Sequence, residues 1–127
     1  MASFYLCSGT SLAEKMEDAR VDLEIRGHIV TSRWHGMEKP RLELDDPKMP
    51  VRAVMDLRDI ERANCLIAFS GQKTGRGGRH FEVGYAYKME MSIFLVGPPE
   101  HAFHTLAHQR FDNWAECLEF IEGYFPH

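Results

Sequence analysis

Short apolar runs alternate with segments of helical length along the chain, and this alternation limits the possible folds more than any other feature. Connections long enough to hold a helix let successive strands run in the same direction, which makes the sheet parallel. We therefore predict an α/β fold, a small doubly wound (Rossmann-like) parallel sheet of four to five strands with helices on both faces, in one domain over residues 1–127. The predicted strands are 4–7, 28–31, 65–69 and 92–96, with a short last strand at 109–111.

Helix start and stop signals lie between these runs. They are, in chain order, a capping box of Ser11 and Glu14, a closing Gly27, a first-turn Pro50 and a capping Asp112 before the terminal helix. Apolar residues spaced by three and four, such as Ala53, Leu57 and Ile60, predict the buried face of the second helix.

The composition is that of a soluble globular protein. The chain has 127 residues, of which 44% are hydrophobic, and a formal net charge of −4. A negative net charge argues against a nucleic-acid polymer or a membrane surface as partner, and no apolar run approaches the ~18 residues of a membrane span. Cys7, Cys65 and Cys117 are odd in number and far apart, so we interpret them as buried thiols of a cytoplasmic protein.

The functional site is expected at the carboxyl ends of the strands, where open α/β sheets bind ligands next to the point at which the strand order reverses. This rule places four segments around one site, 7–11, 33–36, 70–81 and 97–104. Gly9, in the first of them, is a predicted substrate-binding residue. The polar stretch 37–49 shows no regular period and has the length of a lid or substrate loop.

A glycine-rich loop with two arginines follows the third predicted strand, SGQKTGRGGRHFE over residues 70–82. Glycines let backbone N–H groups approach a ligand closely, and a helix start leaves N–H groups unpaired. The predicted phosphate and sugar contacts are Gly75, Arg76, Gly77, Gly78 and Arg79. The loop lacks the Gly-Lys-Ser/Thr of a P-loop and the third glycine of a dinucleotide fingerprint. A flexible turn with solvated arginines is the alternative interpretation.

Glu82 is the predicted chemical centre of the site. It falls in the expected first turn of the third helix between apolar Phe81 and Val83, so a buried carboxylate is indicated. The alternative is an exposed carboxylate stabilised by the helix dipole. Asp56 and Asp59, near the end of the second helix, have by spacing alone the character of solvated acids.

Histidine and tryptophan side chains offer two further candidates. His101, His104 and His108 have spacings that could align metal ligands on a helix, but acidic residues at a helpful spacing are scarce, so the sequence favours no metal. Trp34 and His35, after the second strand, are predicted to form a stacking surface for a base, with a core or rim position as the alternative.

Three motifs, taken in order, resemble the nucleoside 2-deoxyribosyltransferase family, including its relatives that hydrolyse the N-glycosidic bond of deoxynucleoside 5′-monophosphates. They are FYLCSG at 4–9, DLRDI at 56–60 followed by ANCLIA at 63–68, and GRHFEVGYA at 78–86. The last is the most specific, because the family has Glu-(Ile/Leu/Val)-Gly-x-Ala after a glycine-containing loop. The resemblance implies that Glu82 is a nucleophile at the anomeric carbon, that Tyr5 orients its carboxylate and that Asp56 handles the proton of the departing base.

The resemblance also bears on the 5′ end of the sugar and on assembly. Six residues before the Glu, transferases carry an acid and the monophosphate hydrolases a small hydroxyl residue, whereas this chain has Arg76. A guanidinium can bind two phosphate oxygens at once, so a 5′-phosphate is expected. Family members complete each site with a residue of a neighbouring subunit, which implies a homodimer or higher homo-oligomer with His104 and Thr105 as substrate-binding residues.

The sequence thus predicts an enzyme that cleaves or transfers at the N-glycosidic bond of a (deoxy)nucleoside 5′-monophosphate. Its partner is a small-molecule nucleotide or nucleoside, and neither a metal nor a redox cofactor is expected. The alternative is a non-catalytic module that sequesters or senses a nucleotide in the same crevice. The sequence does not decide whether the sugar is deoxyribose or ribose. It also leaves open whether the acceptor is water or a second base.

Overall fold

The computed structural model describes residues 1–71 and 77–125. Within them the chain forms a five-stranded parallel sheet in the order β2-β1-β3-β4-β5. The strands are β1 (Ser3–Cys7), β2 (Ile29–Val30), β3 (Cys65–Phe69), β4 (Ser92–Val96) and β5 (Gln109–Phe111). The strand order reverses between β1 and β3, so the predicted doubly wound α/β fold is confirmed.

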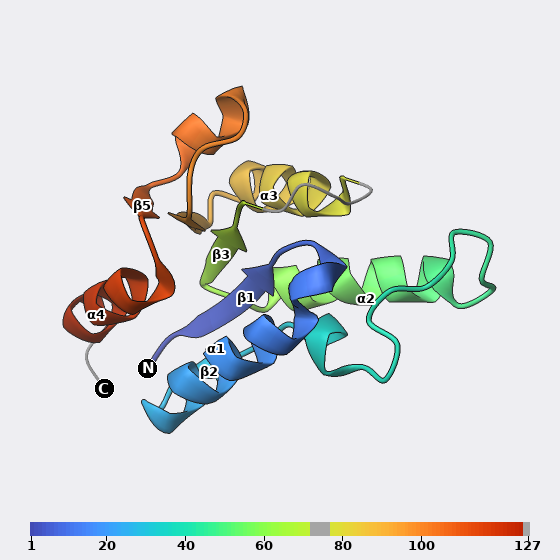
Figure 1. Cartoon of the computed structure of the whole chain (residues 1–127), viewed down its shortest axis with the longest axis horizontal. Coiled ribbons are helices and arrows are strands. Elements are labelled where there is room, and N and C mark those ends of the chain that lie inside the picture. Colours follow the sequence, from blue (N-terminus) through green and yellow to red (C-terminus); the bar gives the residue numbers. More distant parts are fainter. Residues whose placement is uncertain (72–76, 126–127) are drawn as a thin grey trace.

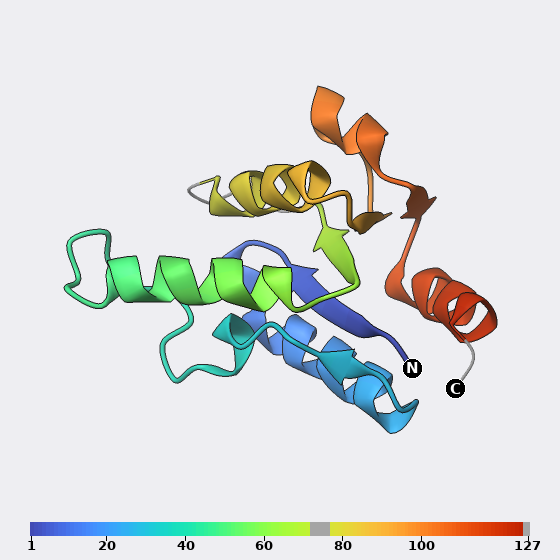
Figure 2. The same ribbon diagram turned by 180° about the vertical axis from the view of Figure 1, so that it is seen from behind.

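Helices cover both faces of the sheet (Figures 1 and 2). They are α1 (Ala13–Ile25), α2 (Met49–Glu61), α3 (Gly78–Lys88) and α4 (Trp114–Tyr124), with short 3-10 helices η1 (Thr10–Leu12), η2 (Trp34–Gly36) and η3 (Ala102–Leu106). On one face α1 and α4 lie side by side, and Trp114 Nε1 donates to Asp22 Oδ2 at 2.8 Å. On the other face α2 and α3 are joined by a hydrogen bond from Tyr85 to Glu61. In the described ranges, we find no helix with the length and apolar character needed to span a membrane.

The core lies between these helices and the central strands. Every residue of β3 is buried, as expected of a strand with parallel neighbours on both edges and helices on both faces. Cys7, Cys65 and Cys117 are free and buried, which confirms their interpretation as buried thiols.

Two of the predicted helix caps are wrong. Ser11 lies within η1, and the residue before α1 is Leu12, which offers no side-chain cap. At α4 the capping residue is Asn113 rather than Asp112, and Asn113 Oδ1 accepts the backbone N–H of Glu116 at 2.9 Å. At α1 a 3-10 turn precedes the helix, whereas at α4 the cap lies one residue later than predicted.

The amino-terminal half of α2 borders a cavity instead of the core. Ala53, predicted to be buried, is therefore exposed, and only towards the end of the helix does Ile60 become fully buried. Asp59, predicted to be solvated, is also completely buried. Its carboxylate accepts hydrogen bonds from Arg33 at 2.8 Å and from Arg62 at 2.5 Å, and these two charges make burial of an acid tolerable.

Candidate active site

A cavity of about 510 Å³ opens at the carboxyl ends of β1 and β3, within the size range of small-molecule sites. Three of the four predicted segments contribute to it, but 97–104 does not, because β4 lies on the far side of β3 from β1. The loop after η2 and the inner face of α2 take its place. Among the residues that line this cavity are Gly9, Trp34, Leu42, Arg52, Asp56 and Glu82.

At one wall of this cavity, two residues of β1 bind the carboxylate of Glu82. Tyr5 Oη donates to Glu82 Oε2 at 2.8 Å, and Cys7 Sγ lies 3.4 Å from Glu82 Oε1, within donor distance of Arg79 O as well. Tyr5 and Cys7 are two residues apart on a strand, so both side chains point to the face that α3 covers. The carboxylate is therefore fixed through both of its oxygens.

The sequence analysis missed Cys7 as part of this site. The signal that could have found it is the period of two in β1, which places Cys7 on the same face as Tyr5. Glu82 itself lies in the second turn of α3, not the first, because the helix already begins at Gly78.

Burial raises the pKa of Glu82 to about 7, and the negative charge of Asp56 adds to the rise. The hydrogen bonds from Tyr5 and Cys7 favour the ionised form and offset part of this shift. Burial, followed by the charge of Glu82, holds the pKa of Tyr5 well above its usual value. Tyr5 therefore stays protonated, and its hydroxyl donates a hydrogen bond to the Glu82 carboxylate.

Asp56 is a second perturbed acid on the opposite, α2 side of the cavity. Burial raises its pKa to about 6, with a further rise from the charge of Asp59. Its Oδ1 is buried and has no hydrogen-bond partner among the described residues. Arg52, one turn before Asp56 on α2, donates to the backbone oxygen of Lys39 at 2.7 Å, which ties the loop after η2 to α2. Asp56 is thus poised to carry a proton.

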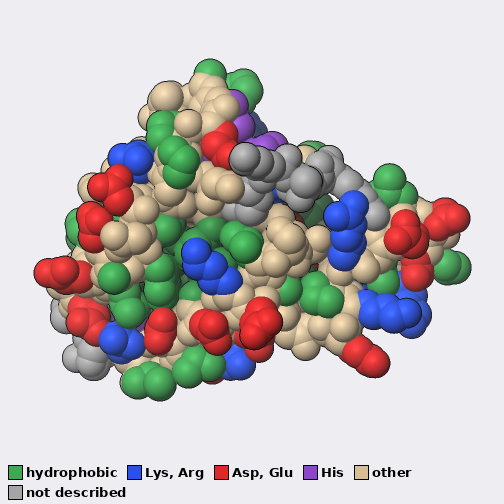
Figure 3. All heavy atoms as spheres, viewed as in Figure 1, with side chains coloured by type: hydrophobic (Ala, Val, Ile, Leu, Met, Phe, Trp, Pro, Cys, Tyr) green, Lys and Arg blue, Asp and Glu red, His purple; other side chains and the backbone are tan. Residues whose placement is uncertain are grey.

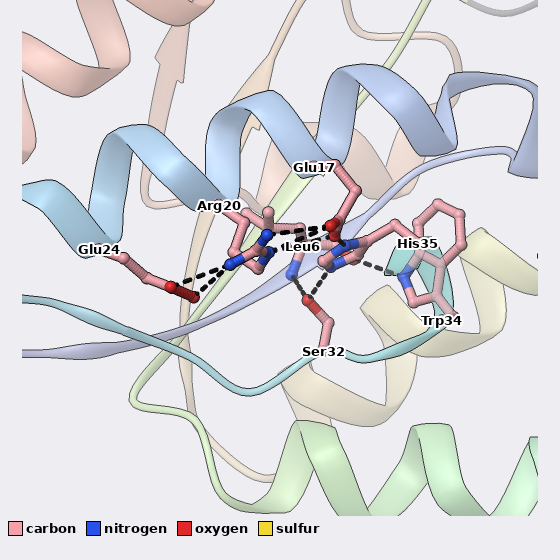
Figure 4. Close-up of polar contacts among 7 residues, drawn as sticks. All are labelled: Leu6, Glu17, Arg20, Glu24, Ser32, Trp34 and His35. Carbon is pink, nitrogen blue, oxygen red and sulfur yellow. Dashed lines mark hydrogen bonds and ion pairs between the residues drawn. The ribbon is translucent and has the colours of Figure 1, made fainter. Parts of the chain in front are cut away.

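Trp34 lines the cavity, whereas His35 does not. Trp34 Nε1 donates to Leu6 O at 2.9 Å. His35 is 4% exposed, and its two ring nitrogens contact Ser32 Oγ at 2.7 Å and Glu17 Oε2 at 2.5 Å (Figure 4). Ser32 Oγ in turn accepts the backbone N–H of Leu6.

The hydrogen bonds of His35 to Ser32 and Glu17 separate its role from that of Trp34. Burial lowers the pKa of His35 in spite of its contact with Glu17, so the neutral ring donates from Nδ1 and accepts at Nε2. His35 therefore anchors η2 to α1 and β1, and Trp34 remains as the stacking candidate. The sequence-based assignment of His35 to substrate binding is not retained.

The glycine loop approaches the same cavity at the start of α3. Gly77 has φ 88°, a conformation that favours glycine, and Gly77, Gly78 and Arg79 all line the cavity. Gly75 and Arg76 lie outside the described residues.

The remaining predicted site residues lie in two places. Gly9 lines the cavity, as predicted. His104 is buried on η3, where its Nδ1 accepts the backbone N–H of Glu100 at 2.9 Å. Thr105 is exposed, and its hydroxyl donates to Ala102 O. Neither lines this cavity, so their assignment to a neighbouring subunit's site stays a prediction.

Comparison with known proteins gives structural matches only. No family model matches the chain, and no curated protein does. A 2-deoxyribosyltransferase from Bacillus psychrosaccharolyticus matches with 21% identity and a TM-score of 0.72 over 92% of this chain and 90% of that chain. The CMP N-glycosidase of Clostridium botulinum matches with 20% identity and a TM-score of 0.63, over 96% and 99%. A 2-deoxyribosyltransferase from Leishmania mexicana matches with 11% identity and a TM-score of 0.69, over 98% and 99%. The chain shares their fold, and these neighbours agree with the family that its motifs resemble.

Proposed function

We propose that this chain cleaves or transfers at the N-glycosidic bond of a (deoxy)nucleoside 5′-monophosphate. The observation that carries the proposal is the pair of perturbed acids in one cavity. Glu82 is held by Tyr5, and Asp56 has a buried oxygen without a hydrogen-bond partner in the described ranges. Glycosidic bond cleavage uses two carboxyl groups, one as carboxylate and one as acid, and a pair that shares one proton near neutral pH can supply both.

In the proposed reaction the Glu82 carboxylate attacks the anomeric carbon as the bond to the base breaks. Positive charge that builds up on the sugar is stabilised by this carboxylate, and a glycosyl ester on Glu82 is the intermediate. Tyr5 donates to one carboxylate oxygen, so it holds the group in a fixed orientation before the attack. Water or a second base then displaces the ester and restores the carboxylate.

Asp56 supplies the proton that the departing base needs. Its raised pKa keeps a useful fraction protonated near neutral pH, and its Oδ1 has no described partner that would compete for the base. After the base leaves, Asp56 is a carboxylate and can take the proton from the incoming acceptor.

The cavity supports a nucleotide as substrate. Trp34 and Leu42 give it apolar walls against which a base can stack, and Arg41, Arg52 and Arg79 bring positive charge for an anion. Figure 3 shows acidic and basic side chains interspersed over the visible face, without a continuous basic stripe of the kind that a nucleic-acid polymer needs.

The test is incubation of the purified protein with a panel of nucleosides and their 5′-monophosphates, followed by chromatography for free base. We expect release of base from one or more monophosphates. Binding of monophosphates without release of base from any panel member would contradict the enzyme and favour the alternative, a module that sequesters or senses a nucleotide.

Arg76→Ala tests the phosphate preference that the sequence implies. A charge-assisted contact to phosphate contributes ~1.5–3 kcal/mol, so kcat/KM for the monophosphate should fall roughly tenfold to a hundredfold, with little change for the bare nucleoside. Steady-state kinetics on both substrates measure this. Arg58→Ala is a suitable control, because Arg58 is exposed and paired with Glu61. Equal losses on both substrates would exclude Arg76 as a phosphate ligand.

We further propose that two copies of the chain associate through η3. Phe103 is 70% and Leu106 43% exposed, and both line a small apolar cavity with Tyr87 of α3. Phe103→Asp should convert the assembly into monomers, measured by light scattering at micromolar concentration. Tyr124→Asp, an equally bulky exposed position on α4, is the control. An unmodified protein that is monomeric and active would refute the shared site.

A further inference from the structure

Three histidines gather beside the proposed active site but outside its cavity. His80 comes from the first turn of α3, and His101 and His104 come from η3 and the residue before it. Each offers one ring nitrogen, and the three nitrogens lie within 4.8 Å of one another. Figure 3 shows histidine side chains clustered at the top of the visible face. The proposed glycosidic chemistry assigns no role to this group in its own subunit.

The distances suit ligands of one ion. His80 Nδ1 and His101 Nε2 are 3.0 Å apart, and two ligands of a tetrahedral zinc ion with bonds of about 2.0–2.1 Å stand roughly 3.3 Å apart. The rings of His101 and His104 have centroids 3.8 Å apart, because the backbone N–H of His104 donates to the oxygen of His101 and so closes the first turn of η3. Small side-chain movements would bring one nitrogen of each ring to bonding distance of a single ion.

The surroundings favour neutral imidazole, the form that binds metals. Burial, followed by the nearby positive charges of Arg79 or the other histidines, lowers the pKa of His80 and His104. Glu100, which lies 3.9 Å from Arg79, is the acidic group facing the cluster from the same segment.

We propose that His80, His101 and His104 form a three-histidine site for a divalent transition-metal ion, with zinc as the best match and a fourth position open to water. The ion would join η3 to the start of α3, two residues before Glu82. This inference does not depend on the proposed enzymatic activity.

Binding requires protons to move within the rings. One of the two rings carries the proton that lies between His80 Nδ1 and His101 Nε2. On metal binding this proton moves to the other nitrogen of the same ring, which is Nε2 of His80 or Nδ1 of His101. His104 Nδ1 accepts from the backbone of Glu100, so its Nε2 carries the proton when the ring is neutral. Coordination through Nε2 moves that proton to Nδ1 and breaks the bond to Glu100. Because this bond is lost, we expect a dissociation constant on the order of micromolar rather than nanomolar.

The experiment uses the full chain without an affinity tag, stripped with a chelator and dialysed. Equilibrium dialysis against Zn²⁺ should give one ion per chain, and Zn²⁺ in excess should raise Tm by roughly 5–10 °C. Co²⁺ in place of Zn²⁺ should give the visible absorption of a four-coordinate ion. Binding is measured on the folded chain, in which the three cysteines are buried and therefore cannot bind Zn²⁺ themselves.

His101→Gln and His104→Gln should each weaken Zn²⁺ binding at least tenfold and remove the Co²⁺ absorption. His80→Gln serves as a further variant because His80, unlike His104, is only partly buried. His108→Gln is the matched control, since His108 Nδ1 instead accepts the backbone N–H of Ile93. Failure of the unmodified chain to bind Zn²⁺, or equal binding by the cluster variants, would overturn the proposal.

Discussion

Replacing Glu82 with Gln should lower kcat by roughly a thousandfold or more while leaving the Kd for a monophosphate nearly unchanged. An amide fills the same space and its oxygen still accepts the hydrogen bond from Tyr5, but it cannot attack the anomeric carbon. Base release under single-turnover conditions and calorimetric titration of the same nucleotide measure the two quantities. Glu119→Gln, at an exposed position of α4, is the control and should match the unmodified protein.

The same substitution should stabilise the protein at high pH. Burial raises the pKa of Glu82 to about 7, so the folded state favours the protonated form, and this contribution is lost as the pH rises through 7. Gln cannot ionise and avoids the loss. The variant should therefore gain about 2–3 kcal/mol in the free energy of unfolding at pH 8, or roughly 5–10 °C in Tm, and almost nothing at pH 4.5.

Thermal denaturation at both pH values separates a functional from a structural role of Glu82. A variant that melts lower than the unmodified protein at pH 8 would show that the ionised carboxylate stabilises the fold. A variant that still releases base at an unchanged rate would remove Glu82 from the mechanism.

The sequence was sufficient for the fold because its strand-length runs and helical connections allow few arrangements. It could not fix the order of the strands, and that order decides which loops meet. With β4 beyond β3, the stretch 97–104 lies away from the cavity, and the loop after η2 lines it instead. Spacing along one chain carries no information about which strand edges become neighbours.

Buried polar groups were also beyond prediction from spacing. Asp59 is buried because Arg33 and Arg62 reach it from other turns, and His35 is buried because Glu17 and Ser32 supply both of its partners. Arg62 and Ser32 lie only three residues from their partners, but Arg33 and Glu17 come from elements that the sequence gives no reason to pair with them. The placement of Glu82 next to Tyr5, by contrast, was expected, but only from the family resemblance of the motifs around them.

Asp56→Asn should lower kcat for an ordinary monophosphate by roughly a hundredfold to ten-thousandfold, because the base then leaves without a proton. The loss should depend on the leaving group. With 4-nitrophenol in place of the base, which departs readily as an anion, the same substitution should cost less than about tenfold. Asp18→Asn, at an exposed position of α1, is the control. A loss of equal size on both substrates would mean that Asp56 positions the sugar instead of protonating the base.

The pH dependence of kcat/KM, measured for the unmodified protein and for Asp56→Asn, is a second test of the role of Asp56. Glu82 and Asp56, with pKa values of about 7 and about 6, share one proton between these two pH values. The pH profile of kcat/KM for the unmodified protein should therefore be bell-shaped, increasing as the pH is raised to 6 and decreasing as it is raised above 7. In the reactive arrangement the shared proton lies on Asp56 and the negative charge on Glu82. In Asp56→Asn the charge that helps to raise the pKa of Glu82 is gone. With the nitrophenol substrate, kcat/KM should then rise through a single pKa below 7 and stay level at higher pH, whereas a retained alkaline limb would assign the second ionisation to another group.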